Sequence, residues 1–418
     1  MTVRISLLPN GLRVATDTMG DATSVSLGVF IARGTRNEMP GRDGIAHLLE
    51  HMVFKGTTRR RAQQIAEEIE NVGGYLDAWT GREQTAYTAR VLGEHVPLAI
   101  DLIGDMLRNS IFDPAELARE RNVVLQEIAE SEDDPGDIIF DRLQETAFPN
   151  QGLGRPILGR ADIVAQLEAM DLRDHLSSHY RVPSMVITAA GKIEHDRFLE
   201  DVGTAFADWP TAPLETPPPS HYKGGFYLKD RKLEQAHLAL AFSGPSLGDH
   251  RRHAGALYAL LLGGGMSSRL FQEVREKRGL AYSVHAFLWP YSDTGLFGMY
   301  LGVAPNRAHE AIGVALDCMA SSINHINVEE LSRAKAQAKA SLLMGKESTM
   351  QRCDALAYQL LVWNRTFSLE EQVADLNSVT INDIHTLGKS MLTAPPSFAA
   401  IGTKTKIGSL TGLFEKFP

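Results

Sequence analysis

A proline-rich segment at the midpoint of the chain is the feature that most restricts the fold. Residues 209–220 contain five prolines, too many for a helix interior or an inner strand, so we predict an extended linker. A chain of 418 residues is also too long for one ordinary core, and two domains of about 200 residues each are expected. We therefore predict one domain over 1–208, a linker over 209–222 and a second domain over 223–418.

The same order of elements is predicted on both sides of the linker. The first half contains predicted strands at 3–7, 12–18, 24–33, 75–80, 84–91 and 185–190 and predicted helices at 44–54, 60–72, 95–108, 113–132, 136–147, 161–179 and 195–207. The second half contains predicted strands at 224–229, 235–243, 281–289, 294–303 and 397–401 and predicted helices at 250–262, 267–277, 306–322, 328–345, 349–362 and 368–391.

A local match supports an internal repeat. The sequence Glu-Leu-Ala-Arg at 116–119 recurs as Glu-Leu-Ser-Arg at 330–333, an offset of 214 residues. We therefore expect an α+β protein with two homologous α/β domains, each an antiparallel or mixed sheet flanked by helices. The two domains are expected to face each other across a cleft, like a clamshell.

The strongest chemical signal is the sequence His-Leu-Leu-Glu-His at 47–51. On a helix, His47 and His51 fall on one face a turn apart, where both imidazoles can reach one metal ion. Glu50 lies in the same neighbourhood. Two histidines and a nearby carboxylate are typical of catalytic zinc. The predicted helix 113–132 is the best source of a third ligand, because it carries Glu116, Glu120, Glu127, Glu130 and Glu132.

The order His-x-x-Glu-His reverses the commoner zinc motif and is the inverzincin signature. With its flanking residues, it makes the chain resemble the pitrilysin-type inverzincin peptidases, particularly the mitochondrial processing peptidase group and its bacterial relatives. The resembling stretches are 44–57, 73–85, 120–127 and 263–282, and the resemblance extends over nearly the whole chain.

The resemblance implies a ligand set for one Zn²⁺ per chain. Its third ligand is a glutamate about 76 residues beyond the second histidine, which is Glu127 in this chain, and a second glutamate that supports the site falls on Glu120. At the offset of the internal repeat these glutamates correspond to Ser341 and Ala334, so only the first domain is expected to bind metal. Zinc held by His47, His51 and Glu127 would activate a water molecule, and Glu50 would act as general base.

The resemblance also indicates how a peptide substrate is held. The predicted strand 75–80 would be an edge strand onto which the substrate adds as another strand, although an ordinary strand of the sheet without a substrate role is an equal alternative. Asp77 stands where relatives often have asparagine. Arg275 and Tyr282 match an arginine–tyrosine pair of the family's second domain and would contact the substrate or its developing oxyanion.

Two other patterns are interpreted as structural. His175 and His179 are also four residues apart, but no carboxylate lies between them, and we interpret them as helix-surface histidines. The triple glycine at 263–265 is not followed by the Lys-Ser/Thr of a phosphate-binding loop, so we interpret it as a flexible helix end.

Composition restricts the partners and the compartment. The net charge of -9 argues against nonspecific nucleic-acid binding. No apolar run approaches the roughly 20 residues of a membrane helix, so no membrane association is expected. The first residues alternate like a strand and do not resemble a targeting leader, and the only cysteines are Cys318 and Cys353. We therefore predict a cytoplasmic protein.

The sequence is thus interpreted as a zinc metalloendopeptidase that hydrolyses unfolded or extended peptides in an enclosed cleft. Family members of this length usually pair, and the presence of the zinc motif together with Arg275 and Tyr282 favours a homodimer over a pair with a homologous sister subunit. One alternative is a noncatalytic peptide-binding or scaffolding subunit of a processing complex, although such subunits typically lack part of the motif. A second alternative is a zinc hydrolase that does not act on peptides.

Overall fold

The computed structural model describes residues 3–403 and divides them into two compact units. The first unit consists of residues 3–129, 155–218 and 343–367, and the second unit of residues 130–154, 219–342 and 368–403. Each unit is a mixed sheet flanked by helices, so the predicted α+β fold is confirmed. Each unit also includes one segment from beyond the linker, which the predicted division into 1–208 and 223–418 did not anticipate.

The first unit is built on a six-stranded sheet in the order β1-β2-β6-β3-β5-β4. β2 and β6 are parallel, and the other neighbouring strands are antiparallel. The strands are β1 Val3–Leu7, β2 Arg13–Thr18, β3 Ser24–Ile31, β4 Tyr75–Thr80, β5 Thr85–Leu92 and β6 Met185–Gly191. The helices are α1 Ile45–Met52, α2 Ala62–Glu70, α3 Val96–Asn109, α4 Pro114–Asp133, α6 Ala161–Val164, α7 Ala169–His179, α8 His195–Phe206 and α12 Thr349–Trp363.

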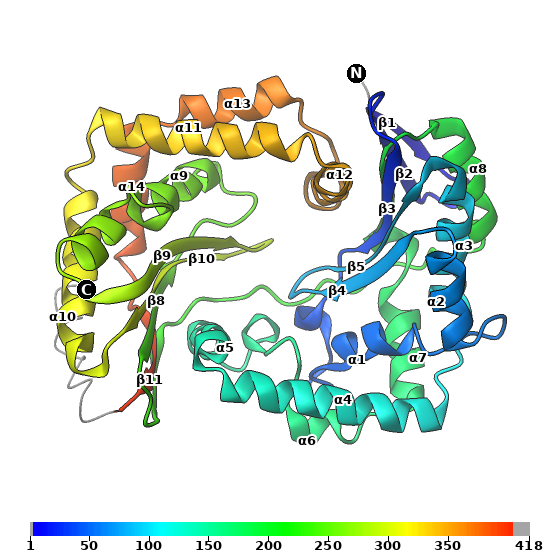
Figure 1. The fold of residues 1–418 in the computed structure, drawn as a ribbon, viewed down its shortest axis with the longest axis horizontal. Helices are drawn as coiled ribbons and strands as arrows, with labels where there is room; N and C mark the ends of the chain where they lie inside the picture. Colours follow the sequence, from blue (N-terminus) through cyan, green and yellow to red (C-terminus); the bar gives the residue numbers. More distant parts are fainter. Residues whose placement is uncertain (1–2, 404–418) are drawn as a thin grey trace. The chain divides into compact units, whose positions relative to one another are not determined.

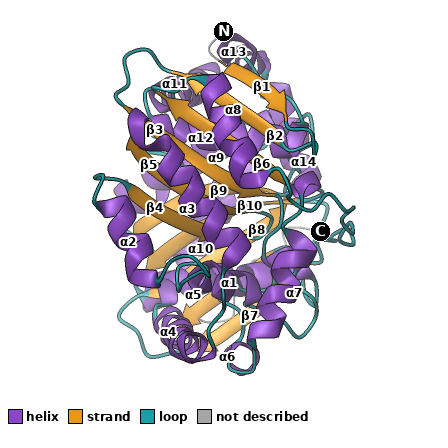
Figure 2. Cartoon of the chain, turned by 90° about the vertical axis from the view of Figure 1, so that its right-hand side faces the viewer, coloured by secondary structure: helices purple, strands orange, loops and turns teal. Residues whose placement is uncertain are grey.

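The central strand β3 shows why both faces of this sheet are covered. Val25, Leu27, Val29 and Ile31 point into the larger core, which also contains apolar residues of α1, α3 and α8. Figure 2 looks onto α3 and α8. Phe30 points to the opposite face and packs against α12. α12 contacts β3, and both elements are labelled in Figure 1.

α12 comes from the second half of the sequence. Its buried residues Cys353, Leu356, Ala357 and Leu360 follow helical spacing and form one apolar stripe. This stripe packs on small or apolar side chains of the first unit's strands, including Ala15 and Ala190.

The second unit has a five-stranded sheet in the order β7-β11-β8-β10-β9, in which only β7 and β11 are parallel. The strands are β7 Gly225–Asp230, β8 Ala236–Ser243, β9 Ala281–Pro290, β10 Gly295–Val303 and β11 Ser397–Gly402. The helices are α5 Pro135–Ala147, α9 Arg252–Gly263, α10 Ala308–Ser322, α11 Val328–Gly345, α13 Leu369–Ser378 and α14 Ile381–Met391, with a π-helical turn at Phe271–Glu276.

The sheet of the second unit repeats the same packing scheme with a helix from the first half of the sequence. Leu238, Leu240 and Phe242 of β8 point into a core with α9, α10 and α14. On the other face, Ala239 and Ala241 pack with residues of α5. Each unit thus has one sheet face covered by a helix that lies on the far side of the linker in the sequence.

The helices predicted over 161–179 are α6 and α7, and those predicted over 368–391 are α13 and α14. The break between α13 and α14 has a clear local cause, because Thr380 caps α14 by accepting a hydrogen bond from the backbone of Asp383. One helix prediction needs correction. The predicted helix 267–277 is short and includes the π-helical turn. Among the described residues, no helix is long and apolar enough to cross a membrane.

Candidate metal centre

The candidate metal centre depends on how α1 begins. Gly44 precedes the helix with φ of 88°, and a Cβ there would lie 2.6 Å from the carbonyl oxygen of Leu158, so only glycine fits. Glycine has no side chain that could cap the helix, and the side chain of Glu38 acts as the cap instead. The Glu38 carboxylate accepts hydrogen bonds from the backbone N–H groups of Gly44 and Ala46, both at 3.0 Å. Glu38 therefore satisfies two of the free donors at the start of α1.

The helix places His47 and His51 on one face, as predicted from their spacing. Their ring centroids are 4.7 Å apart, and Nε2 of each lies 3.7 Å from Oε2 of Glu127 on α4. The three residues are the one group among the described histidines, cysteines and carboxylates that could hold a metal ion, with ligand atoms within 4.8 Å of one another. The structure therefore brings His47, His51 and Glu127 together.

The geometry of this group fits zinc. Ligand atoms of a tetrahedral zinc site lie about 3.4 Å apart, given bonds of about 2.0–2.1 Å. The two nitrogen-to-oxygen distances of 3.7 Å are close to that separation. Burial, and then the neighbouring His51, lower the pKa of His47 to about 4, so its imidazole is neutral at pH 7 and can donate a lone pair. Two imidazoles and one carboxylate also leave a fourth position for water or substrate.

His51 is oriented by a carboxylate on its other side. Its Nδ1 lies 3.1 Å from Oε2 of Glu120, a position that directs Nε2 towards Glu127. The Glu120 side chain is only 9% exposed, and its other oxygen pairs with Nζ of Lys55 at 2.8 Å. Nδ1 of His47, by contrast, is buried and has no hydrogen-bond partner among residues 3–403.

Glu50 lies on α1 beside the ligands without joining them. Its Oε2 is buried and has no hydrogen-bond partner in the described part of the chain. Burial raises the pKa of Glu50, and the negative charges of Asp77 and Glu127 act in the same direction, whereas a hydrogen bond from Thr80 and the proximity of His51 oppose the rise. A carboxylate with a free oxygen and a raised pKa is suited to accept a proton.

The strand β4 is an edge strand, as one of the two sequence interpretations predicted. It pairs only with β5, and its contacts with α1 place it beside the metal residues. A hollow of about 580 Å³ lies at the start of this strand, between α2 and the end of α1. Its lining is mainly apolar and includes Phe54, Ile65, Ile69 and Leu76.

Arg275 and Tyr282 are adjacent to each other in the second unit. Arg275 belongs to the π-helical turn, and its guanidinium carbon lies 4.7 Å from the ring centroid of Phe271 and 5.2 Å from that of Tyr282. The side chain of Tyr282 is largely exposed at the start of β9. The predicted pair is therefore a local unit, and its contact with substrate stays a prediction.

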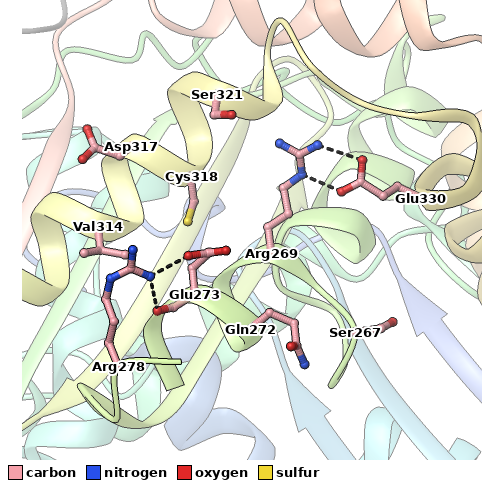
Figure 3. A pocket seen from close by; sticks show the side chains of 10 residues that line it. All are labelled: Ser267, Arg269, Gln272, Glu273, Arg278, Val314, Asp317, Cys318, Ser321 and Glu330. Carbon is pink, nitrogen blue, oxygen red and sulfur yellow. Dashed lines mark hydrogen bonds and ion pairs between the residues drawn. The ribbon is translucent and has the colours of Figure 1, made fainter. Parts of the chain in front are cut away.

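A further hollow of about 450 Å³ in the second unit is lined by charged residues that are already paired (Figure 3). Arg269 binds Glu330 at 2.7 Å, and Arg278 binds Glu273 at 2.5 Å. Burial raises the pKa of the Cys318 thiol to about 11, so the sulfur in this hollow is protonated at neutral pH and is a poor nucleophile. These residues give no sign of a second reaction centre.

The interpretation of His175 and His179 as helix-surface residues was wrong for His175. His175 is buried, and its ring stacks on that of His179 with centroids 4.3 Å apart. The two nitrogens of His179 contact the backbone oxygens of His175 and Asn37 at 2.9 and 3.1 Å. The pair is therefore part of the packing between α7 and the loop before α1, and it is not a metal site.

Two residues that support the centre were not predicted from the sequence. Lys55 follows His51 by four residues, and this spacing was the signal that could have indicated a contact beside the histidine face. Glu38 lies in an irregular loop before α1, where no periodic pattern indicates its contact with the helix start.

Comparison with known proteins agrees with this geometry. The family model described as insulinase, peptidase family M16, matches residues 13–161, which include every residue of the candidate metal centre. The model described as the peptidase M16 inactive domain matches residues 166–338, which contain no candidate metal ligand among the described residues.

Individual relatives are similar over nearly the whole chain. An uncharacterized zinc protease of Streptomyces coelicolor is 39% identical over 411 residues, covering 96% of this chain and 90% of the relative. A probable mitochondrial-processing peptidase subunit beta of Arabidopsis thaliana is 36% identical, covering 91% of this chain and 74% of the relative. The crystal structure of a protease from Helicobacter pylori shares the fold, with a TM-score of 0.89 at 21% identity and coverage of 96% of this chain and 99% of that chain.

Both family models together extend over most of the chain, and the reported relatives cover 96% and 91% of it. The reversed motif, the ligand geometry and the similarity therefore lead to one conclusion. The chain belongs to peptidase family M16.

Proposed function

We propose that the protein is a zinc-dependent endopeptidase that hydrolyses peptide bonds in unfolded or extended peptides. The observation that carries the proposal is the convergence of His47, His51 and Glu127 within 4.8 Å, beside a Glu50 carboxyl oxygen that has no partner among the described residues. Related chains that carry the name zinc protease support the same conclusion.

The proposed reaction needs a base, a metal and an acid. Zinc bound by His47, His51 and Glu127 would lower the pKa of water and polarise the peptide carbonyl. Glu50 accepts one proton from the attacking water as the new carbon–oxygen bond forms. It then transfers that proton to the amide nitrogen as the carbon–nitrogen bond breaks, so the products are a carboxylic acid and an amine. No covalent intermediate with the protein is required.

The free edge of β4 provides a place for an extended substrate. A peptide that adds beside β4 would pair through its main chain, a mode that tolerates many sequences. The apolar hollow at the start of the strand would take one apolar side chain of that peptide. The proposed pairing requires an extended backbone, so folded segments are expected to resist cleavage.

Two further parts of the proposal rest on the family resemblance. Arg275 and Tyr282 of the second unit contribute to substrate binding, and replacement of Tyr282 by phenylalanine is expected to reduce turnover by removing a hydroxyl donor. The protein is proposed to act as a homodimer, which size-exclusion chromatography with light scattering would detect.

The central experiment measures zinc content and peptide cleavage in the same preparation. We expect one zinc per chain, cleavage of an unfolded peptide, loss of cleavage after treatment with a chelator and recovery after addition of zinc. Glu127→Gln is expected to lose zinc and activity. Glu130→Gln, at an exposed position of the same helix, is the matched control and should keep both. A protein that binds zinc but cleaves no unfolded peptide would instead support a noncatalytic peptide-binding role.

A further inference from the structure

Lys55 extends the histidine face of α1 beyond the end of the helix. α1 ends at Met52, but hydrogen bonds from the backbone N–H of Phe54 to His51 and of Lys55 to Met52 continue the chain in a tight turn. His47, His51 and Lys55 therefore follow one another at intervals of four residues along one side of the chain.

This side of α1 faces two glutamates of α4 in reverse order. Glu127 lies 3.7 Å from both His47 and His51, and Glu120 lies 3.1 Å from His51 and 2.8 Å from Lys55. Glu120 and Glu127 are seven residues apart, which places them two turns apart on one face of α4. The order of these contacts shows that the two segments run past each other in opposite directions. Glu127 bridges His47 and His51, and Glu120 bridges His51 and Lys55. Figure 1 shows α1 beside α4.

In this set of contacts, the ammonium group of Lys55 pairs with the oxygen of Glu120 that does not contact His51. That carboxylate is nearly buried, and its ion pairs with other described side chains are those with His51 and Lys55. A buried carboxylate oxygen without a partner is costly, so the Lys55 contact fixes the position of the group that accepts from Nδ1 of His51.

We propose that Lys55 is a positioning residue for the metal centre, which acts through Glu120 on His51. The inference rests on the proposed zinc site and goes beyond its ligands and base. It predicts that loss of the ammonium group weakens zinc binding even though Lys55 does not touch the ligand atoms. Direct repulsion between the Lys55 ammonium group and Zn²⁺ would have the opposite effect, because its removal would strengthen the binding of Zn²⁺.

The test measures zinc affinity of the metal-free protein by competition with a chromophoric chelator. Lys55→Met is expected to weaken zinc binding roughly 10–100-fold, the range typical when a partner of a ligating histidine is lost. Lys55→Arg keeps a cation at the same position and should bind within about threefold of wild type. Lys192→Met, at an exposed lysine of the first unit, is the matched control and should not change zinc affinity.

A double-mutant cycle tests whether the effect passes through Glu120. In a Glu120→Ala background, the additional change Lys55→Met should cause no further loss of zinc affinity, because the group that transmits the effect is absent. The denaturation midpoint of each metal-free variant shows whether the fold is intact, and Lys55→Gln, which also removes the cation, supplies the readout if Lys55→Met is unstable.

Several results would overturn the inference. Unchanged or tighter zinc binding by Lys55→Met, or equal losses with and without Glu120, would show that Lys55 does not act through Glu120. Such a result would leave the proposed peptidase function intact. A wild-type protein that binds no zinc would overturn the proposed function and this inference together.

Discussion

Nδ1 of His51 and Oε2 of Glu120 lie 3.1 Å apart, and this contact assigns separate tasks to the two nitrogens of one imidazole. Because a carboxylate oxygen can only accept, Nδ1 donates the hydrogen bond, and Nε2 on the other side of the ring faces Glu127. The orientation of the proposed metal ligand is therefore set by a residue 69 positions away in sequence.

Replacement of Glu50 by glutamine should separate zinc binding from catalysis. The side chain keeps its size but loses the ability to accept a proton, and we expect kcat to fall roughly 10²–10⁴-fold. Zinc content should stay at the wild-type level, because Glu50 is not in the group that could hold the metal. Steady-state cleavage of an unfolded peptide and metal analysis measure the two properties. Glu94→Gln, at a 75% exposed side chain, is the control, and near-wild-type turnover of Glu50→Gln would refute the role as base.

Removal of the Glu38 carboxylate should destabilise the start of α1. Glu38→Ala leaves the buried N–H groups of Gly44 and Ala46 without their acceptor, at a cost of about 1–3 kcal/mol. Glu38→Gln keeps one acceptor oxygen and should cost less. Urea unfolding of the metal-free protein measures both changes, and an equal loss of stability in the two variants would contradict the capping role.

Replacement of Asp354 by asparagine should remove part of the pH dependence of stability. Burial raises the pKa of Asp354 to about 6, and its Oδ1 has no hydrogen-bond partner in the described part of the chain. In the unfolded chain the Asp354 carboxyl ionises at a pKa of about 3.9, whereas in the folded protein it keeps its proton up to about pH 6. The folded state is therefore favoured below about pH 3.9, and this contribution to the free energy of unfolding is lost as the pH rises through about 6. Asp354→Asn should therefore gain stability relative to wild type at pH 7.5, and the difference should shrink towards pH 4.

Denaturant midpoints of the two proteins across this pH range give the measurement for Asp354. A difference between wild type and Asp354→Asn that stays constant from pH 4 to pH 7.5 would show that Asp354 does not titrate in this interval.

Truncation of Leu356 should destabilise the first unit, although this residue lies in the second half of the sequence. Leu356 is 4% exposed and packs with Phe30 and Ala86 of the first unit's sheet. Leu356→Ala should cost about 2–5 kcal/mol. Hydrogen exchange of β3 and β5 would localise the loss. Leu92→Ala, at a 48% exposed leucine, is the control and should change stability by less than about 0.5 kcal/mol.

The individual helices and strands were predictable because the residue spacing that specifies each of them lies within the element itself. The strand predicted at 24–33 is observed at Ser24–Ile31, and the helical spacing of His47 and His51 is confirmed. The choice of Glu127 as the proposed third ligand needed the family resemblance, because helix 113–132 offers several glutamates of equal chemistry.

The partners of these elements were decided only by tertiary structure. An apolar stripe such as that of α12 shows that a helix has a buried face, but it does not show which sheet receives that face. The same is true of Lys55, Glu120 and His51: their spacing fixes the side of the helix on which each lies, whereas the packing of α4 against α1 brings them together. The sequence by itself thus determined the residue types of the proposed metal site and their local geometry. The packing of distant segments determined how those residues are held, because burial and hydrogen bonding are properties of the folded chain.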